Sequence, residues 1–549
     1  MISKKIPWWV IVCIFAALTV GFFAGSFLTG KSFGRKLFLN PENKIDVILD
    51  IIGAEYVDQV DIKSLTENAI YKIIGELDPH SNYIPAGDLG KINEDMEGHF
   101  AGVGIESFVF SDTLVIINTA QGGPAQQAGL FPGDRIVTVN DTVFAGEAFS
   151  PDRILTALRG TIGTTVKIGI MRKGSDLVQN YNIVRNYIPI TTVKASYQVE
   201  EGIGLIKIFD KFSHTTYDEF IKAIAELLSD GCHSFIIDLR TNSGGAFDAA
   251  VKISNEFLPR GRRIVYTEGK SFPRENAVAN GLGTLQNNPV VILMDQTSAS
   301  ASEIVAGAIQ DNDRGLIIGR RSFGKGLVQN QIELSDGSAF RLTVARYYTP
   351  SGRNIQRHYT LGNADEYNQD WMIRFSNGEE FHENSAAVDT GLLYHTLNGR
   401  EVYGGGGIMP DIFVPLDTSE LTSYYAHLEK KNIFHQFACE YTDINRSKLN
   451  EFKDYRSMWE YLKMQPVLYE IVDFAAARKI KPRTALINIS SNYILNTTYA
   501  YILQNFFGEE VFFIVCMDRD KDIKKAVDIL QKGLAHSEAV VEMKYKQFR

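Results

Sequence analysis

Residues 297–304 contain serines at a position where a hydroxyl could attack an acyl group. They follow the apolar run 289–294, which predicts a buried strand, and they open a helical pattern at residues 303–310. A hydroxyl at such a strand-to-helix turn gains the positive end of the helix dipole and lies near backbone N–H groups without intrahelical partners. Local considerations leave three candidate nucleophiles open: Ser298, Ser300 and Ser302.

A candidate base lies at Lys325, between Gly324 and Gly326. A serine is a poor nucleophile near neutral pH, and a lysine can take its proton only if burial lowers the lysine pKa. Gln329 follows four positions later in a run with strand character, so it shares a face with Lys325 and could orient the amine. The ordinary alternatives are a helix cap for the serines and a solvated surface position for the lysine.

Together these segments resemble the carboxyl-terminal processing peptidases, the tail-specific proteases of family S41. That family has its serine in Ser-Ala-Ser-Glu, its lysine in Phe-Gly-Lys-Gly and a glutamine four residues later, and all three pieces occur here. The family's spacing of 25 residues between serine and lysine selects Ser300, a choice that comes from the resemblance. The resemblance implies a catalytic set of Ser300, Lys325 and Gln329, with no metal or cofactor.

Other motifs of the family follow in the same order within residues 65–415. They lie at residues 77–83, 98–106, 238–246, 347–352 and 407–411. A glycine pair after the apolar strand 234–239 could present N–H groups to a carbonyl oxygen, although a plain structural turn is the alternative. The resemblance implies that the N–H groups of Gly244 and Ala301 form an oxyanion hole.

Residues 93–187 resemble a PDZ domain, a β-rich fold with two helices. A glycine-rich loop before a strand leaves N–H groups free to receive a terminal carboxylate, and the peptide then adds as an extra strand. The loop residues are Gly102, Val103, Gly104 and Ile105. An amphipathic helix at residues 152–159 would line the peptide groove. Its candidate pocket residues are Ile154, Leu155 and Leu158, and the alternative is that they only fill the domain core.

The N-terminus carries a charge-free stretch of 23 residues, 8–30, after Lys4 and Lys5. This length can cross a bilayer, which favours an uncleaved anchor over a cleaved signal peptide. The family is exported in bacteria, so the resemblance implies a single-pass inner-membrane protein with its catalytic part in the periplasm. If the segment is cleaved, the protein would be exported.

The composition supports several domains and excludes some partners. The chain has 549 residues, of which 45% are hydrophobic and 22% charged, and its net charge of -9 argues against nucleic acid as a partner. Its four cysteines and ten histidines show no metal-binding spacing, which makes a metallopeptidase a poor hypothesis.

We therefore expect a multidomain α/β protein. The predicted parts are a membrane segment (1–36), a helical region (37–92), the PDZ domain (93–187), a crotonase/ClpP-like α/β protease core (188–415) and a mainly helical C-terminal extension (416–549). In relatives the N-terminal helical region helps to build a dimer or a substrate gate, so a homodimer is expected. Residues 355–405 carry no motif that can be interpreted.

The function expected from these observations is that of a serine endopeptidase with a serine/lysine dyad. It would bind unstructured C-terminal tails through its PDZ domain and cleave exported proteins, and a lipoprotein adaptor could deliver them. One alternative is a membrane-tethered PDZ adaptor or chaperone without catalysis, which would have no use for a buried lysine beside a serine. Another is a crotonase-like acyl-CoA enzyme, which would leave the PDZ domain and the lysine unexplained.

Overall fold

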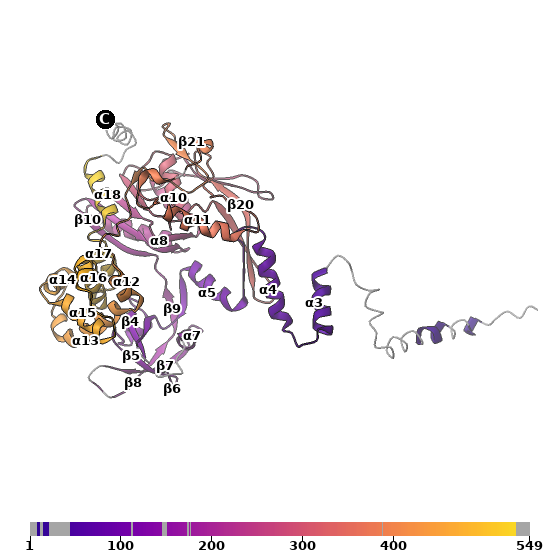
Figure 1. Ribbon diagram of the computed structural model, residues 1–549, viewed down its shortest axis with the longest axis horizontal. Helices are drawn as coiled ribbons and strands as arrows, with labels where there is room; N and C mark the ends of the chain where they lie inside the picture. The colour runs from indigo at the N-terminus through magenta and orange to yellow at the C-terminus, as the bar shows by residue number, and fades with distance from the viewer. Residues whose placement is uncertain are drawn as a thin grey trace, which may run out of the picture. The chain divides into compact units, whose positions relative to one another are not determined.

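The computed structural model describes residues 8–10, 15–20, 44–110, 113–144, 151–172, 175, 177–386 and 388–533 (Figure 1). The chain divides into two compact units, residues 1–76 and 77–549. Most of the expected membrane segment, 8–30, lies outside the described residues. Within the described ranges, no helix combines the length and the apolar character that a bilayer span requires.

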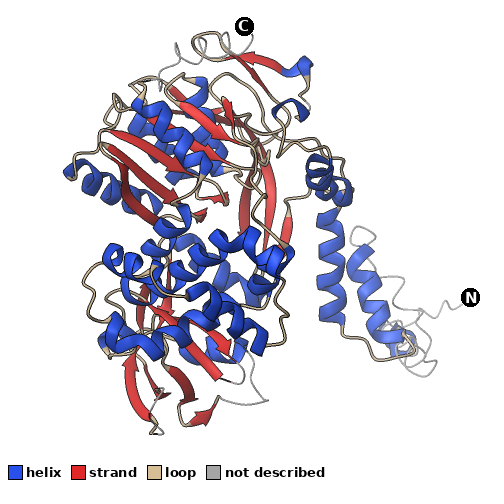
Figure 2. Ribbon diagram, turned by 60° about the vertical axis from the view of Figure 1, so that its left-hand side comes forward, coloured by secondary structure: helices blue, strands red, loops and turns tan. Residues whose placement is uncertain are grey.

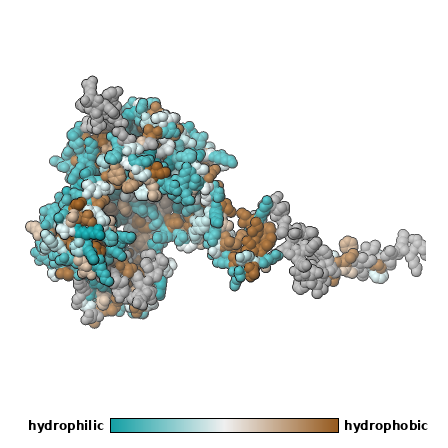
Figure 3. Space-filling view, viewed as in Figure 1, coloured by the Kyte–Doolittle hydropathy of each residue, from teal (hydrophilic) through white to brown (hydrophobic). Residues whose placement is uncertain are grey.

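The first unit contains a helical hairpin, as the sequence predicts for this region. Its helices are α3 (Lys44–Glu55) and α4 (Ile62–Gly75), and the Asp61 side chain caps α4 by accepting from the Lys63 and Ser64 N–H groups. Neither helix contains a buried residue. Ile45, Ile48 and Ile73 are each about half exposed, and Figure 3 shows apolar side chains gathered on this hairpin.

Residues 99–189 form a β-rich domain with two helices, as expected. Its antiparallel sheet has the order β3-β4-β5-β7-β8, with β6 paired to β5. The strands are β3 (Ile105–Phe110), β4 (Thr113–Thr119), β5 (Arg135–Val139), β6 (Thr142–Val143), β7 (Thr165–Met171) and β8 (Gln179–Val184), and the helices are α6 (Pro124–Gln127) and α7 (Pro151–Leu158). A separate pair, β2 (His99–Gly102) with β9 (Asn186–Pro189), joins the two ends of the domain. Because β3 lies at the sheet edge, it can accept an added strand.

The centre of the second unit is a six-stranded sheet of the order β10-β11-β13-β17-β18-β23. The strands are β10 (Val193–Glu200), β11 (Ile203–Ile208), β13 (Ser234–Asp238), β17 (Val290–Met294), β18 (Leu316–Gly319) and β23 (Ile412–Phe413). All neighbours pair in parallel except β10 with β11. Every residue of β11, β13, β17 and β18 is buried, which is typical of a parallel sheet covered on both faces.

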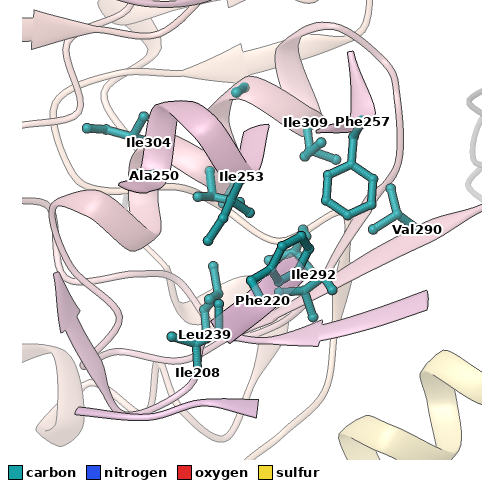
Figure 4. Packing of buried hydrophobic residues seen from close by; sticks show 14 of the residues in the cluster. Ile208, Phe220, Leu239, Ala250, Ile253, Phe257, Val290, Ile292, Ile304 and Ile309 are labelled. Atoms are coloured by element: carbon teal, nitrogen blue, oxygen red, sulfur yellow. The ribbon is translucent and has the colours of Figure 1, made fainter. Parts of the chain in front are cut away.

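Three helices cover one face of this sheet: α8 (Thr216–Ser229), α9 (Phe247–Phe257) and α10 (Ala301–Asp311). Figure 4 shows their side chains meeting those of the strands. Phe220 of α8, Ile253 of α9 and Ile309 of α10 pack in one cluster with Ile208 and Ile292 of the sheet. This layer fixes the start of α10, where the candidate serines lie.

The other face is covered by the last described helix, α18 (Lys521–Gln531), which Figure 1 draws in yellow. Its buried residues Ile523, Ala526 and Ile529 pack with Ile236, Val291 and Ile318 of the sheet. The sequence placed this helix in an extension beyond residue 415. Its packing makes it the second layer on the six-stranded core sheet.

A second sheet follows the loop that contains the candidate base Lys325 and includes Gln329. Its path is β1-β20-β15-β16, and β19 pairs with β20. The strands are β1 (Asn82–Ile84), β15 (Arg263–Glu268), β16 (Glu275–Val278), β19 (Leu327–Glu333) and β20 (Ala339–Tyr348). Helix α5 (Ala86–Glu97) leads from β1 to the PDZ-like domain. Gly98 ends this helix with φ 77°, a conformation that favours glycine.

The remaining parts are mainly helical. Residues 355–405 contain α11 (Ala364–Ser376) and the hairpin of β21 (Leu393–His395) with β22 (Glu401–Tyr403). Earlier in the chain, β12 (Asp210–Phe212) pairs with β14 (Asn242–Gly245). Beyond the core sheet lie α12 (Ser423–Lys430), α13 (Ile433–Leu449), α14 (Tyr455–Lys463), α15 (Val467–Ala477), α16 (Thr484–Phe507) and α17 (Glu509–Met517). Helices α12 to α17 share a core of their own that includes Phe434, Leu462 and Ile494 (Figure 2).

Candidate active site

Ser300 occupies the turn between β17 and α10 in a conformation that few residues adopt. Its φ of 53° and ψ of -110° lie outside the ordinary regions for a residue with a side chain. Strain of this kind persists where the surrounding structure enforces it, and it is common at functional sites. The sharp turn leaves Ser300 partly exposed at the start of α10, beside N–H groups that have no intrahelical acceptor.

The two neighbouring serines have structural roles. Both are fully buried: the Ser298 hydroxyl donates to the Leu239 carbonyl at 2.8 Å, and the Ser302 hydroxyl donates to Asn242 Oδ1 at 2.9 Å. Ser300 is the one among the three that lines a pocket. The geometry thus supplies a physical reason for preferring Ser300, which the sequence chose only by resemblance.

A buried carboxylate connects Ser300 to the loop that carries Lys325. Glu303 is fully buried and accepts the N–H groups of Ser300 at 2.8 Å, Gly324 at 2.7 Å and Lys325 at 2.9 Å, together with the Ser322 hydroxyl. Burial raises the pKa of Glu303, and these donors oppose the rise. The role of Glu303 was not predicted from the sequence. Its place three residues after a serine N-cap, a capping-box pattern, was the signal that could have found it.

Lys325 meets the requirement for a lysine base. Burial is the main reason that its pKa is lowered, and the Arg341 cation lowers it further, while Glu303 and Asp78 act in the opposite direction. Its Nζ donates to Gln329 Oε1 at 3.3 Å. The two side chains are therefore paired as expected, but not on one strand face, because Lys325 lies in the loop before β19 (Leu327–Glu333) and the strand has an irregular register at Gln329.

Gln329 is itself held by the segment that precedes the PDZ-like domain. Its Nε2 donates to the His80 carbonyl, which leaves Oε1 directed to Lys325. Asp78 fixes this segment by accepting the N–H groups of His80 at 2.9 Å and Ser81 at 3.0 Å. The motif at residues 77–83 therefore has a structural use that the sequence did not reveal.

Tyr347 bridges the backbone of the nucleophile turn and the backbone of the Lys325 loop. Its buried hydroxyl lies 3.1 Å from the Ser300 carbonyl oxygen and 2.7 Å from the Lys325 carbonyl oxygen, and it can donate to either. It belongs to the motif at residues 347–352, whose role was not evident from the sequence.

One pocket of about 600 Å³ brings the predicted residues together. Its lining includes all five of the predicted core residues: Ser300, Lys325, Gln329, Gly244 and Ala301. Ile92 and Met96 of α5 also line this pocket. A peptide in this pocket would meet the hydroxyl, the amine and the backbone of the glycine loop at once.

The glycine loop approaches Ser300 closely. Gly244 has φ 102°, and a Cβ at this position would lie 3.1 Å from the Ala301 nitrogen. Within the described part of the chain, the Ala301 N–H has no acceptor and is free for an oxyanion. The Gly244 N–H, however, donates to Asn242 Oδ1 at 3.0 Å. Both donors are thus near the nucleophile, and Gly244 must release Asn242 before it can serve an oxyanion.

The carbonyls of the glycine-rich loop in the PDZ-like domain bind neighbouring backbone groups, while the expected carboxylate binding by its N–H groups stays a prediction. Gly104 has φ 75°, and the carbonyls of Val103 and Gly104 accept the N–H groups of Ala125 and Ala120, both at 2.9 Å. Gly102 ends β2 and Ile105 opens the edge strand β3.

The predicted pocket residues of α7 show packing rather than exposure. Ile154 and Leu158 are buried in the domain core, while the Leu155 side chain lies outside what the structure describes. A groove function for these three residues therefore stays a prediction.

Comparison with known proteins identifies the family. Residues 202–364 match the model of peptidase family S41, and residues 94–182 match that of the PDZ domain. The carboxy-terminal-processing protease of Bartonella bacilliformis is 37% identical over 314 residues, which cover 56% of this chain and 71% of the relative. The chain belongs to this S41 family of serine peptidases. The resemblance drawn from the sequence motifs is confirmed.

The comparisons give three further matches. The carboxyl-terminal-processing protease of a Synechocystis species is 34% identical and covers 53% of this chain and 69% of that protein. A solved structure, the photosystem II D1 C-terminal processing protease, matches 56% of this chain and 83% of its own at 29% identity, with a TM-score of 0.31. Residues 424–508 match a family of unknown function.

Proposed function

We propose that this S41 peptidase cleaves proteins whose unstructured C-terminal tails its PDZ domain captures, with Ser300 as nucleophile and Lys325 as base. The observation that carries the proposal is the shared pocket. Ser300, the one serine of its turn that lines the pocket, shares that lining with the partly buried Lys325, whose amine donates to Gln329. A PDZ adaptor without catalysis would not need this arrangement.

The proposed reaction proceeds through an acyl-enzyme. The neutral Lys325 amine takes the proton from the Ser300 hydroxyl, whose oxygen then attacks the scissile carbonyl. The Ala301 N–H and a released Gly244 N–H stabilise the oxyanion. Lys325 gives its proton to the leaving amine, and water, deprotonated by Lys325, frees the Ser300 ester.

Tail capture is proposed from the free edge of β3 and the glycine loop before it. A peptide that adds to β3 would place its terminal carboxylate at the N–H groups of residues 102–105. Helix α5 joins this domain to the core and also lines the active-site pocket. Binding in one place and cleavage in the other are therefore linked through a single helix.

The cellular setting is proposed from the sequence and the hairpin. The charge-free residues 8–30 support an inner-membrane anchor with the peptidase in the periplasm. The apolar residues exposed on α3 and α4 support a homodimer in which a second copy covers them. A lipoprotein adaptor stays a further proposal for substrate delivery.

The decisive experiment uses protein that lacks residues 1–30 and an unfolded substrate with an apolar C-terminus. Wild type is expected to cleave, while Ser300→Ala and Lys325→Ala are expected to bind the substrate without cleaving it. Lys222→Ala, which alters an exposed lysine of α8, is the control and should cleave normally. If wild type and the variants all bind and none cleaves, the PDZ adaptor is the better assignment.

A further inference from the structure

The last helix of the core presents two carboxylates to the loop that bears Gly244. Arg240 Nη1 lies 2.8 Å from an oxygen of Asp520 and 2.8 Å from an oxygen of Asp522. Its Nη2 lies 2.7 Å from Asp238 at the end of β13. The Arg240 side chain is 11% exposed and that of Asp522 is 5% exposed, so these ion pairs are shielded from water. Asp522 also approaches Arg320 at 3.3 Å.

Arg240 lies only four positions before Gly244, and the segment between them is held on two sides. Thr241 has φ 60°, and its N–H approaches the Asp295 carboxylate at 3.2 Å. Asp295 also accepts the N–H groups of Thr297 at 2.9 Å and Ser298 at 3.1 Å. The glycine loop is therefore tied to the nucleophile turn through Asp295 and to α18 through Arg240.

The charges around Arg240 make its position dependent on α18. Among the described residues, its ion-pair partners are Asp238, Asp520 and Asp522, and two of these belong to the start of α18. A buried guanidinium that loses most of its counter-charge is left largely uncompensated, which strongly destabilises its position and favours movement of the side chain. Any movement of Arg240 shifts the backbone that leads directly to Gly244.

The start of α18 is fixed independently of these pairs. The Asp520 side chain caps the helix by accepting the Ile523 N–H at 3.0 Å, and the apolar face of α18 packs on the core sheet. The two carboxylates therefore reach Arg240 from a rigid support. The match to the S41 family model ends at residue 364, long before this helix.

We propose that Asp520 and Asp522 are positioning residues for the oxyanion hole, acting through Arg240. The C-terminal helix α18 is then part of the catalytic apparatus. The inference rests on the proposed function, because it assumes that the Gly244 N–H serves the oxyanion. It gives the end of the chain a role in the chemical step rather than in substrate handling.

The test compares Asp520→Asn and Asp522→Asn with wild type lacking residues 1–30. Asparagine caps helices about as well as aspartate, so Asp520→Asn removes the charge and keeps the cap. We expect kcat to fall about tenfold to a hundredfold, less than the loss on removing an oxyanion donor itself, with KM within about twofold. A peptide aldehyde, which binds Ser300 as a tetrahedral adduct, should weaken by the same factor as kcat/KM, while binding of an uncleavable peptide is unchanged.

Asp528→Asn is the matched control, since Asp528 lies on the same helix in an exposed pair with Lys532. It should leave kcat and aldehyde affinity at wild-type values. If Asp520→Asn and Asp522→Asn fold and keep wild-type kcat, the proposal is wrong and α18 only packs on the sheet. If Asp522→Asn fails to fold, Asp520→Asn, which is more exposed, decides alone.

Failure of the proposed function would look different, because wild type itself would not cleave. In that case, hydrogen exchange of the backbone amides at residues 241–246 tests whether α18 holds the glycine loop in place. Faster exchange in Asp520→Asn than in Asp528→Asn supports control of the loop by α18. Equal exchange in the two variants overturns it.

Discussion

Gly244 approaches Ser300 so closely that a Cβ at position 244 would lie 2.6 Å from the Cβ of Ser300. Real Cβ atoms do not come this near to other carbons, and the φ of 102° at Gly244 would also strain any other residue. The candidate oxyanion donor and the nucleophile therefore share a space that only glycine permits.

Gly244→Ala is expected to lower the rate of cleavage about a hundredfold or more, because the added methyl group displaces either the glycine loop or Ser300. Gly231→Ala is the control: φ there is 85°, and a Cβ would meet nothing within 4 Å. That variant should lose about 1 kcal/mol of unfolding free energy and keep its activity. Initial rates and urea unfolding of both variants test this, and an active Gly244→Ala would exclude Gly244 from the oxyanion hole.

The pH dependence should follow Lys325, which must be neutral to act as a base. Since the Arg341 cation helps to lower the pKa of Lys325, Arg341→Gln should raise that pKa. The acid limb of kcat/KM would then move to higher pH, so that activity falls near neutrality and recovers in more alkaline buffer. Arg346→Gln, an exposed arginine on the same strand, should leave the profile in place. If the acid limb of the Arg341→Gln profile keeps its position or moves to lower pH, the assignment of Lys325 as the base is contradicted.

The candidate catalytic residues could be selected from the sequence because each lies in a short motif with a local physical rationale. Ser300 marks a strand-to-helix turn, and Gln329 follows Lys325 at a spacing of four residues that allows the two side chains to pair. The internal bond from the Gly244 N–H to Asn242 could not be predicted, because it depends on the rotamer of one amide. The contact of Arg240 with Asp522 joins residues 282 positions apart, and such a contact leaves no local pattern.

The fold, like the candidate site, could be predicted from the sequence only in part. The hydrophobic runs predicted the buried strands β13 and β17, since a parallel sheet needs continuous apolar segments. Helix α18 was predicted only as part of a helical extension. An amphipathic pattern shows that a helix has a buried face, but it does not identify the surface that covers it.

Glu303→Gln should uncouple the nucleophile turn from the Lys325 loop. Glutamine offers one acceptor oxygen where the carboxylate serves three N–H groups and a hydroxyl, and its NH₂ group would face donors. We expect a loss of about 2 to 3 kcal/mol in unfolding free energy and a large fall in kcat. Glu226→Gln on the surface of α8 is the control and should change neither quantity. Full activity with unchanged stability in Glu303→Gln would show that the carboxylate is dispensable.

Gly104→Ala should separate tail capture from catalysis. The φ of 75° strains an alanine there, and its Cβ would lie 2.9 Å from Ile188 Cδ1, so the loop before β3 must distort. The dyad belongs to the core and stays intact. KM for a protein substrate with a free tail should rise at least about tenfold, while a short peptide that fits the pocket alone is cleaved at the wild-type rate. Gly122→Ala in the same domain, with φ 68° and open space around it, should affect neither substrate. Equal losses for the tailed protein and the short peptide in Gly104→Ala would mean that this loop supports the core rather than the tail.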